Sequence, residues 1–229
     1  MKKSYVLSMD ERLTLRFDFC KKHLSGCSRD YGIYYSIATL FSFYSDSTAF
    51  KVVEKQLKDF CELASDKRFA ELGTRIYNKK FAASSGHIAP NLTLPDITNQ
   101  NISLSDFKGK TVYMEFTGSW CIFCRKEIPH LIELQKKFKD NPDIEFVSIW
   151  LESAENPSDT WSSYVHGTGL RGIHLYSAAQ FNGKAPKLYQ VEGTPIFMII
   201  DKYGKIVSSN AKRPGEDGIY EDLIRTAGN

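Results

Sequence analysis

The chain has 229 residues, of which 42% are hydrophobic, 25% charged and 13% aromatic, and its formal net charge is +3. This composition is typical of a soluble globular protein and excludes a disordered chain, and the length allows one or two domains. The small net charge argues against a nucleic-acid-binding protein, which usually carries a dense basic face.

Membrane and export signals are weak in this sequence. No apolar run approaches the roughly 20 residues that a membrane-spanning helix needs. Lys2 and Lys3 begin the chain, but charged residues interrupt the next stretch, whereas a secretion signal needs an unbroken apolar run of about 7–15 residues. We therefore expect either a cytoplasmic protein or a mature form without its leader.

Residues 10–82 have the spacing of amphipathic helices, in which apolar side chains recur every three or four positions. Gly26 ends the first predicted helix, and the apolar, aromatic stretch 31–43 predicts a buried second one. The residues expected to face inward are Leu13, Phe17, Cys20 and Leu24, then Tyr31, Tyr34, Tyr35, Phe41, Phe43 and Tyr44, then Phe50, Val53, Leu57 and Phe60, and finally Phe69, Leu72, Ile76 and Lys80. The tyrosines leave a second interpretation open, a surface for a partner or for a second copy.

The pattern changes at Ser84-Ser85-Gly86, after which short extended pieces replace helices. We place a domain boundary there, between a helical domain of residues 1–83 and a second domain of residues 84–229. Strands and helices alternate in the second domain, which predicts an α/β fold with a mixed central sheet. The predicted strands are 111–116, 144–151, 173–176, 195–200 and 205–208, and the predicted helices are 121–139, 159–165 and 218–227.

Two of the five cysteines, Cys121 and Cys124, lie three positions apart where a predicted strand runs into a predicted helix. Residues at this spacing share one helix face, so their sulfurs can close a disulfide. The helix N-terminus stabilises a thiolate at Cys121 and should lower its pKa. Cys124, one turn deeper, is expected to be less exposed. Cys121 is therefore the predicted attacking sulfur, and Cys124 resolves the mixed disulfide.

Other arrangements of the cysteines stay open. A zinc site needs about four ligands, and the remaining Cys and His residues show no matching pair, but half of a zinc site or an inert buried pair would have the same spacing. Cys20 and Cys27 could form a structural disulfide, and Cys61 has no assignable partner.

Several motifs in one order resemble the thioredoxin superfamily, and more narrowly the TlpA/ResA-type thiol-disulfide oxidoreductases of the bacterial cell envelope, which are related to AhpC/TSA proteins. The resemblance covers about residues 86–229. It rests on Ala89-Pro90-Asn91, on 104–110, on Trp120-Cys121-x-x-Cys124, on Glu127-x-Pro129 and on Val191-Glu192-Gly193-Thr194-Pro195. It implies a thioredoxin-like central mixed sheet flanked by helices, here preceded by a small all-α domain.

The resemblance also implies an activity. The family's enzymes cycle between dithiol and disulfide without an organic cofactor or a metal, which implies a disulfide-containing protein substrate and an upstream thiol reductant. It further implies a location in the periplasm or cell envelope. The pair Ile122-Phe123 adds no charge that would stabilise the Cys121 thiolate, and this favours a reductant.

Further site residues follow from the resemblance. It implies that Pro195 is cis and lies against the cysteine pair, which leaves the backbone of Thr194 free to pair with an extended substrate near Cys121. Trp120, together with Phe123, would form an apolar rim where a protein substrate docks.

Two acidic residues have implied roles as well. Glu115 lies six positions before Cys121, where thioredoxins have a buried Asp that relays protons for the second cysteine. A carboxyl group desolvated there would have a raised pKa, which suits a proton acceptor near neutral pH. Glu127 matches a Glu that tunes the cysteine pair in ResA-like proteins. Either residue could instead be an ordinary surface acid.

Two other functions remain as alternatives. A thiol-dependent peroxidase of the peroxiredoxin type needs Thr or Ser three residues before its reactive cysteine, and Gly118 occupies that position. A binding or assembly module would use residues 1–83 to hold a partner, with a secondary redox domain.

Overall fold

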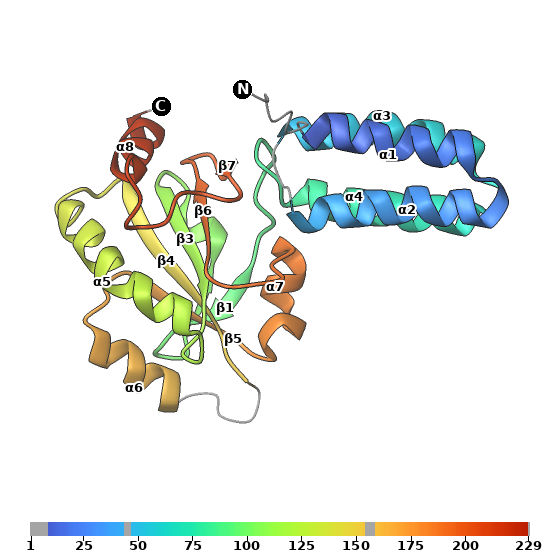
Figure 1. The fold of residues 1–229 in the computed structure, drawn as a ribbon. Helices are drawn as coiled ribbons and strands as arrows, with labels where there is room; N and C mark the ends of the chain where they lie inside the picture. The colour runs from blue at the N-terminus through green and yellow to red at the C-terminus, as the bar shows by residue number, and fades with distance from the viewer. Residues whose placement is uncertain (1–8, 44–46, 154–158, 229) are drawn as a thin grey trace, which may run out of the picture. The chain divides into compact units, whose positions relative to one another are not determined.

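The computed structural model describes residues 9–43, 47–153 and 159–228. Contacts between Cα atoms divide the chain into two compact units, Met1–Ser84 and Ser85–Asn229 (Figure 1). Each unit has hydrophobic clusters of its own. Among the described residues, no helix is both long enough and apolar enough to cross a bilayer.

The first unit is a set of four helices: α1 (Met9–His23), α2 (Gly26–Phe43), α3 (Ser47–Leu63) and α4 (Lys67–Ala82). Each helix buries one apolar stripe against the others. The shared core contains Phe17, Cys20, Ile33, Ile37, Phe50, Val53, Leu57, Phe60, Ala64, Ala70 and Tyr77. The predicted stripe of the third helix, Phe50 to Phe60, is confirmed in full.

The predicted face of the fourth helix is confirmed in part, because Phe69 and Ile76 are half-buried and pack against the core. The buried residues of α4 are Ala70, Gly73 and Tyr77, whereas Leu72 is exposed. A Cβ atom at Gly73 would lie 3.4 Å from a methyl carbon of Leu57, so α4 packs in van der Waals contact with α3 at this point. The most deeply buried residues of α4 therefore lie one position beyond the predicted ones.

The second helix buries aliphatic rather than aromatic side chains. Ile33 and Ile37 are fully buried, while Tyr31 and Tyr35 are 53% and 55% exposed and stack on each other. The prediction that these two tyrosines lie in the core is therefore wrong. Tyr34 is half-buried and packs against the core, as predicted. Tyr44 and the side chains of Leu13, Phe41 and Phe43 lie outside the described part of the structure.

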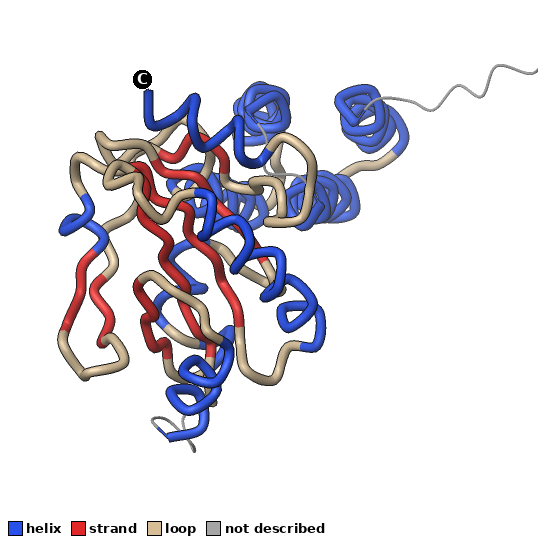
Figure 2. The backbone as a smooth tube through the Cα atoms, turned by 90° about the vertical axis from the view of Figure 1, so that its left-hand side faces the viewer, coloured by secondary structure: helices blue, strands red, loops and turns tan. Residues whose placement is uncertain are grey.

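The second unit has a five-stranded sheet with the order β5-β4-β3-β6-β7. Strands β3 (Thr111–Thr117), β4 (Ile144–Leu151) and β5 (Ile173–Ser177) are parallel, and β6 (Ile196–Ile200) and β7 (Ile206–Ser208) form an antiparallel edge. A two-stranded antiparallel ribbon of β1 (Thr93–Pro95) and β2 (Asn101–Ser103) precedes them. The predicted mixed sheet flanked by helices is confirmed (Figure 2).

The helices of this unit are α5 (Ile122–Lys137), α6 (Asp159–Thr168), α7 (Lys184–Tyr189) and α8 (Ile219–Gly228), with short 3-10 turns at Leu104–Phe107 and Gln180–Asn182. Helix α7 was not predicted from the sequence.

The two faces of the sheet have separate cores. Val112, Met114 and Phe116 of β3 pack with residues of α7 and of the β1–β2 ribbon. Tyr113 of the same strand packs on the other face, with α5 and α8. Since side chains alternate along a strand, Glu115 lies on the same face as Tyr113, beneath the helix that begins at the cysteine motif.

Candidate active site

The predicted disulfide is present between Cys121 and Cys124, whose Cα atoms are 5.2 Å apart. Cys121 is the N-cap residue of α5, and its Sγ accepts a hydrogen bond from the backbone N–H of Cys124 at 3.1 Å. This N–H group belongs to the first turn, where a helix leaves its donors unpaired. The sulfur of Cys121 thus lies where the helix favours negative charge.

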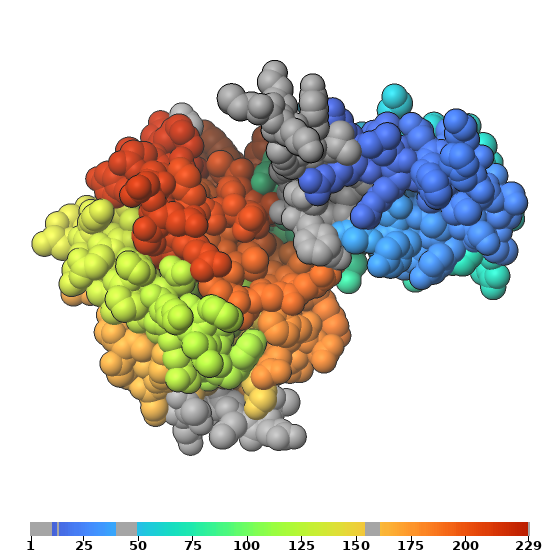
Figure 3. Space-filling view, in the orientation of Figure 1, coloured from blue at the N-terminus to red at the C-terminus, as the bar shows by residue number. Residues whose placement is uncertain are grey.

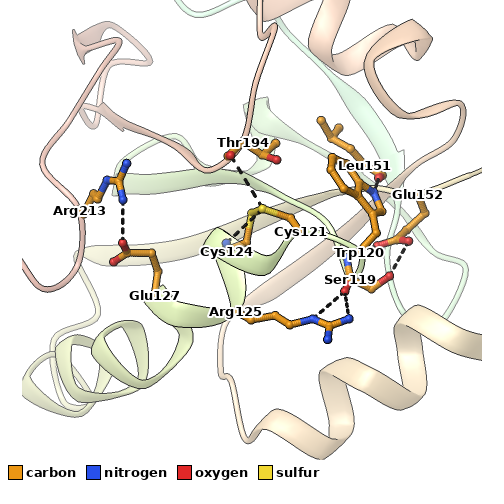
Figure 4. The surroundings of a disulfide bond; sticks show 10 residues. All are labelled: Ser119, Trp120, Cys121, Cys124, Arg125, Glu127, Leu151, Glu152, Thr194 and Arg213. Carbon is orange, nitrogen blue, oxygen red and sulfur yellow. Dashed lines mark hydrogen bonds and ion pairs between the residues drawn. A yellow bond between two sulfur atoms is a disulfide. The ribbon is translucent and has the colours of Figure 1, made fainter.

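Cys121 and Cys124 are both buried in this disulfide-bonded state, at 4% and 3% exposed, so the predicted difference in exposure is small here. One cause is the chain segment that covers Cys121: the carbonyl oxygen of Thr194 lies 3.8 Å from its Sγ (Figure 4). The three other cysteines are free thiols, so a Cys20–Cys27 disulfide is not formed.

The peptide bond between Thr194 and Pro195 is cis, as the resemblance implied. This bond directly precedes β6, the neighbour of β3 in the sheet. The strand that ends before the cysteine motif and the strand that begins after Pro195 are therefore side by side. On the surface, yellow-green atoms of α5 adjoin orange atoms of the segment around Thr194 (Figure 3).

Glu115 is buried and accepts a hydrogen bond from the hydroxyl of Ser148 at 2.7 Å. Burial raises the pKa of Glu115 to about 7, because desolvation of the charged form outweighs the stabilising hydrogen bond from Ser148. The negative charge of Glu127 raises this pKa further. A carboxyl group with this pKa can take up and release a proton near neutral pH.

Glu127 lies one turn beyond Cys124 on α5 and is mostly buried. Its Oε1 accepts from Nη1 of Arg213 at 3.1 Å, an ion pair that joins α5 to the segment between β7 and α8 (Figure 4). The two carboxyl groups therefore differ in their surroundings. Glu115 lies beneath α5 and has no cation partner among the described residues, whereas Glu127 pairs with Arg213.

An apolar surface surrounds the start of α5. Trp120, Ile122 and Phe123 are 39%, 68% and 64% exposed. The Trp120 ring meets Phe181 edge-on at 5.8 Å between centroids, and Lys126 lies over the face of Phe123. Three large exposed apolar side chains beside one disulfide are typical of a surface that contacts another molecule.

The comparisons with known proteins agree with this geometry. The model of the AhpC/TSA family matches residues 85–209, which is more than half of the chain and includes both cysteines and Pro195. The chain belongs to the AhpC/TSA family.

Within this family it is similar to ResA thiol-disulfide oxidoreductases. The ResA of Bacillus subtilis (strain 168) is 33% identical over 141 residues, which cover 59% of this chain and 74% of that protein. The ResA of Bacillus cereus is 31% identical over 131 residues, covering 57% and 72%. These matches support a TlpA/ResA-like thiol-disulfide oxidoreductase of the thioredoxin superfamily.

Solved structures of thiol-disulfide oxidoreductases are also similar to this chain. The thioredoxin domain of a thiol-disulfide oxidoreductase from Bacteroides vulgatus has a TM-score of 0.54 and 25% identity, and the match covers 62% of this chain and 96% of that one. A thiol:disulfide interchange protein from a Bacteroides species has a TM-score of 0.53 and 25% identity, with 65% and 93% covered. The matched shares fit the α/β unit of this AhpC/TSA-family chain rather than its whole length.

Sequence reasoning missed the residues that anchor the loop before Cys121. Ser119 of this loop binds Glu152 and Arg125, and neither partner was singled out from the sequence. A signal for Glu152 existed, because it directly follows β4, and the carboxyl ends of the parallel strands β3 and β4 meet at one edge of the sheet. Arg213 carried no such signal, because only the tertiary structure brings it to Glu127.

Proposed function

We propose that this protein reduces disulfide bonds of other proteins outside the cytoplasm, in a dithiol–disulfide cycle of Cys121 and Cys124. The observation that carries the proposal is the disulfide at the first turn of α5, in which the sulfur of Cys121 lies beside the carbonyl of Thr194. In this position a substrate backbone and a substrate disulfide can reach the same site.

The cycle starts from the dithiol form. The Cys121 thiolate attacks one sulfur of the substrate disulfide, a mixed disulfide forms, and the other substrate sulfur leaves as a thiolate. The thiolate of Cys124 then attacks Sγ of Cys121, which closes the bond seen here and releases the second substrate sulfur. Two electrons pass to the substrate, and an upstream thiol reductant returns them to the pair.

Proton handling falls to Glu115 in this proposal. Cys124 must lose its proton before it can attack, and Glu115 lies on the sheet face that α5 covers, with a pKa of about 7. Glu127 tunes the pair from the next turn of α5 through its negative charge. Both roles follow the resemblance, and burial of Glu115 supports its part.

Substrate contact falls to Trp120, Thr194 and Pro195. Trp120 offers an exposed ring at the edge of the site, and Thr194 offers backbone groups for pairing with an extended chain. Because Ile122 and Phe123 add no positive charge near Cys121, the thiolate gains no extra stability, which favours the reducing direction.

Location and domain roles belong to the same proposal. The similarity to ResA proteins supports a place in the cell envelope or periplasm, and the helical domain of residues 1–83 precedes a redox domain of residues 84–229. The separate hydrophobic clusters of the two units support this division. The exposed Tyr31 and Tyr35 make the helical domain the candidate surface for a partner.

The test is insulin reduction by the full chain and by Cys121→Ser. The variant should lose turnover, whereas Cys124→Ser should trap a mixed disulfide with the substrate. Turnover retained by Cys121→Ser would end the proposal. A redox titration of the Cys121–Cys124 pair shows whether it acts as a reductant or an oxidant. A potential of about −270 mV supports a reductant, and one of about −120 mV supports an oxidant.

A peroxidase assay covers the main alternative. Peroxiredoxins would need a hydroxyl side chain at position 118, but a Cβ atom at Gly118 would lie 2.7 Å from Nε1 of Trp120. We therefore expect no rapid thiol-dependent consumption of hydrogen peroxide, and rapid consumption would contradict the reductase proposal.

A further inference from the structure

Several hydrogen bonds fix the loop that precedes Cys121. Ser119 lies two residues before Cys121, in the connection between β3 and α5. Its backbone N–H donates to Oε1 of Glu152 at 2.7 Å, and its hydroxyl donates to Oε2 of the same residue at 2.8 Å (Figure 4). Its carbonyl oxygen accepts from the guanidinium of Arg125, through Nε at 3.0 Å and through Nη2. All three polar groups of Ser119 are thus engaged.

The partner of these bonds is a buried carboxylate. Glu152 is 6% exposed, and its two carboxylate oxygens bind the two donors of Ser119. Removing a carboxylate from water is unfavourable unless it is paired or hydrogen-bonded. Among the described residues no cation forms an ion pair with Glu152. The two hydrogen bonds from Ser119 therefore offset the cost of burying its carboxylate.

The backbone of Glu152 is rigidly placed. Its N–H donates to the carbonyl of Ser177 at the end of β5, and its carbonyl accepts from the N–H of Gln180, both at 3.0 Å. The preceding residue, Leu151, accepts a hydrogen bond from Nε1 of Trp120 at 2.6 Å. Two consecutive residues at the end of β4 therefore hold two consecutive residues of the loop.

Arg125 closes the arrangement from the helix side. Its guanidinium lies over the ring of Tyr164 in α6 at 5.4 Å from the centroid while it binds the Ser119 carbonyl. The loop is thereby fixed between the edge of the sheet and the first turn of α5. The hydrogen bonds of Ser119 therefore also restrain the next two residues of the chain, Trp120 and Cys121.

We propose that Glu152 is a positioning residue of the redox site, which fixes the loop 118–121 and so keeps the sulfur of Cys121 at the first turn of α5 when the disulfide is open. In the oxidised state the bond to Cys124 itself restrains Cys121. In the dithiol state that restraint is gone, and the anchor of Ser119 must hold the sulfur in line with the helix N–H groups. The inference rests on the proposed function only for the role of Cys121 as the attacking sulfur.

The test compares five forms of the full-length protein in the reduced state: the wild type, Glu152→Gln, Ser119→Ala, the double variant and a control. Glu152→Gln keeps the size of the side chain but replaces two charge-assisted hydrogen bonds with neutral ones, and its amide nitrogen must donate to the Ser119 hydroxyl instead of accepting from it. Ser119→Ala removes the hydroxyl and keeps the N–H bond, and it is the second variant if Glu152→Gln does not fold. Glu145→Gln is the matched control, because Glu145 lies at the opposite, partly exposed end of β4 from Glu152 and pairs there with Lys110.

The readout is the rate at which iodoacetamide alkylates Cys121 across a pH series, followed by mass spectrometry of the peptide that carries this residue. In Glu152→Gln we expect Cys121 to be alkylated about 10-fold to 100-fold more slowly near neutral pH. The pH dependence of this rate should move to higher pH. Ser119→Ala should move the profile less. Alkylation of the double variant should be no slower than that of Glu152→Gln, because both substitutions act on the same contact between Ser119 and Glu152. The control should match the wild-type protein.

Folded variants of Glu152 and Ser119 whose Cys121 profile coincides with that of the wild-type protein would overturn the inference. Insulin reduction measured on the same samples separates this result from the proposed function. If the wild-type protein failed to reduce insulin, the reductase proposal would fall, but the alkylation profiles would still decide whether Glu152 positions the sulfur.

Discussion

Ser148 donates a 2.7 Å hydrogen bond to Glu115 from the position directly opposite it in the parallel pair of β3 and β4. Both side chains are buried on the sheet face that α5 covers. A charged carboxylate is unfavourable there, and burial raises the pKa of Glu115 to about 7. The hydroxyl of Ser148 limits this effect by stabilising the charged form, so the two residues together set the proton affinity beneath the cysteine pair.

Glu115→Gln should raise stability at alkaline pH. The pKa of Glu115 is about 7 in the folded protein and has an ordinary value near 4.5 when unfolded. Its contribution to stability is therefore present below pH 4.5 and is lost as pH rises through 7. Relative to the wild-type protein, Glu115→Gln should gain about 3 kcal/mol in free energy of unfolding above pH 7. Urea unfolding of the oxidised protein at acid and alkaline pH measures the difference, and equal stability of the two proteins at pH 8 would contradict it.

The same variant should impair the redox cycle. If Glu115 accepts the proton of Cys124, Glu115→Gln should release the mixed disulfide about 100-fold more slowly, since this is a typical contribution of a general base. The first attack by Cys121 should change far less. Single-turnover reduction of a substrate disulfide, with mixed and released products separated by mass, distinguishes the two steps. A variant in which both steps are unchanged would remove Glu115 from the mechanism.

Ser148→Ala should shift the pH dependence of activity upwards. Without the hydroxyl, nothing on β4 stabilises the charged form of Glu115, so its pKa rises further above 7. A hydrogen bond to a charged group of about 1.5–3 kcal/mol corresponds to a shift of at least one pH unit in the rising limb of the profile. Ser148→Thr keeps a hydroxyl and serves as the control. A profile for Ser148→Ala that superimposes on the wild-type curve would mean that Glu115 does not limit the rate.

Asp30→Asn should destabilise the helical unit. Asp30 is fully buried, pairs with Arg29 and accepts from the backbone N–H of Asp66 at 2.7 Å, which ties α2 to the turn before α4. Weakening a buried pair of this kind should cost about 3 kcal/mol. Asp59→Asn breaks the exposed pair with Lys21 and should cost less than about 1 kcal/mol. Hydrogen exchange of the amides of Ile33 and Ile37 reports the change within this unit, and equal effects of the two variants would refute the buried role.

Gly73→Ala should stabilise the same unit. A Cβ atom at this position would lie 3.4 Å from a methyl carbon of Leu57 and 3.6 Å from one of Ile37, which are ordinary van der Waals contacts. Since the backbone is helical, the gain in helix propensity should be about 0.5–1 kcal/mol. Gly183→Ala is the opposite case, because its Cβ would lie 2.3 Å from the carbonyl oxygen of Ala178. Thermal unfolding of both variants checks the contrast, and a lower melting temperature for Gly73→Ala would show that Leu57 cannot move.

The sequence by itself determined the local features of this protein. Apolar spacing predicted four helices and then the order of strands and helices, because each element buries one face and its period shows which face is apolar. The spacing of Cys121 and Cys124 at a strand–helix junction predicted the disulfide, since three residues span one helical turn. These conclusions need only neighbours along the chain.

The tertiary structure alone decided the rest. Glu152 holds Ser119 from 33 positions away, and Arg213 holds Glu127 from 86 positions away. Packing also buried Ala70 and Gly73 of α4 more deeply than the predicted Phe69 and Leu72, and it left Tyr31 exposed. Hydrogen bonds, burial and close packing act through space over a few ångströms, so the partner of a side chain and the dielectric around it are known only once the chain has folded.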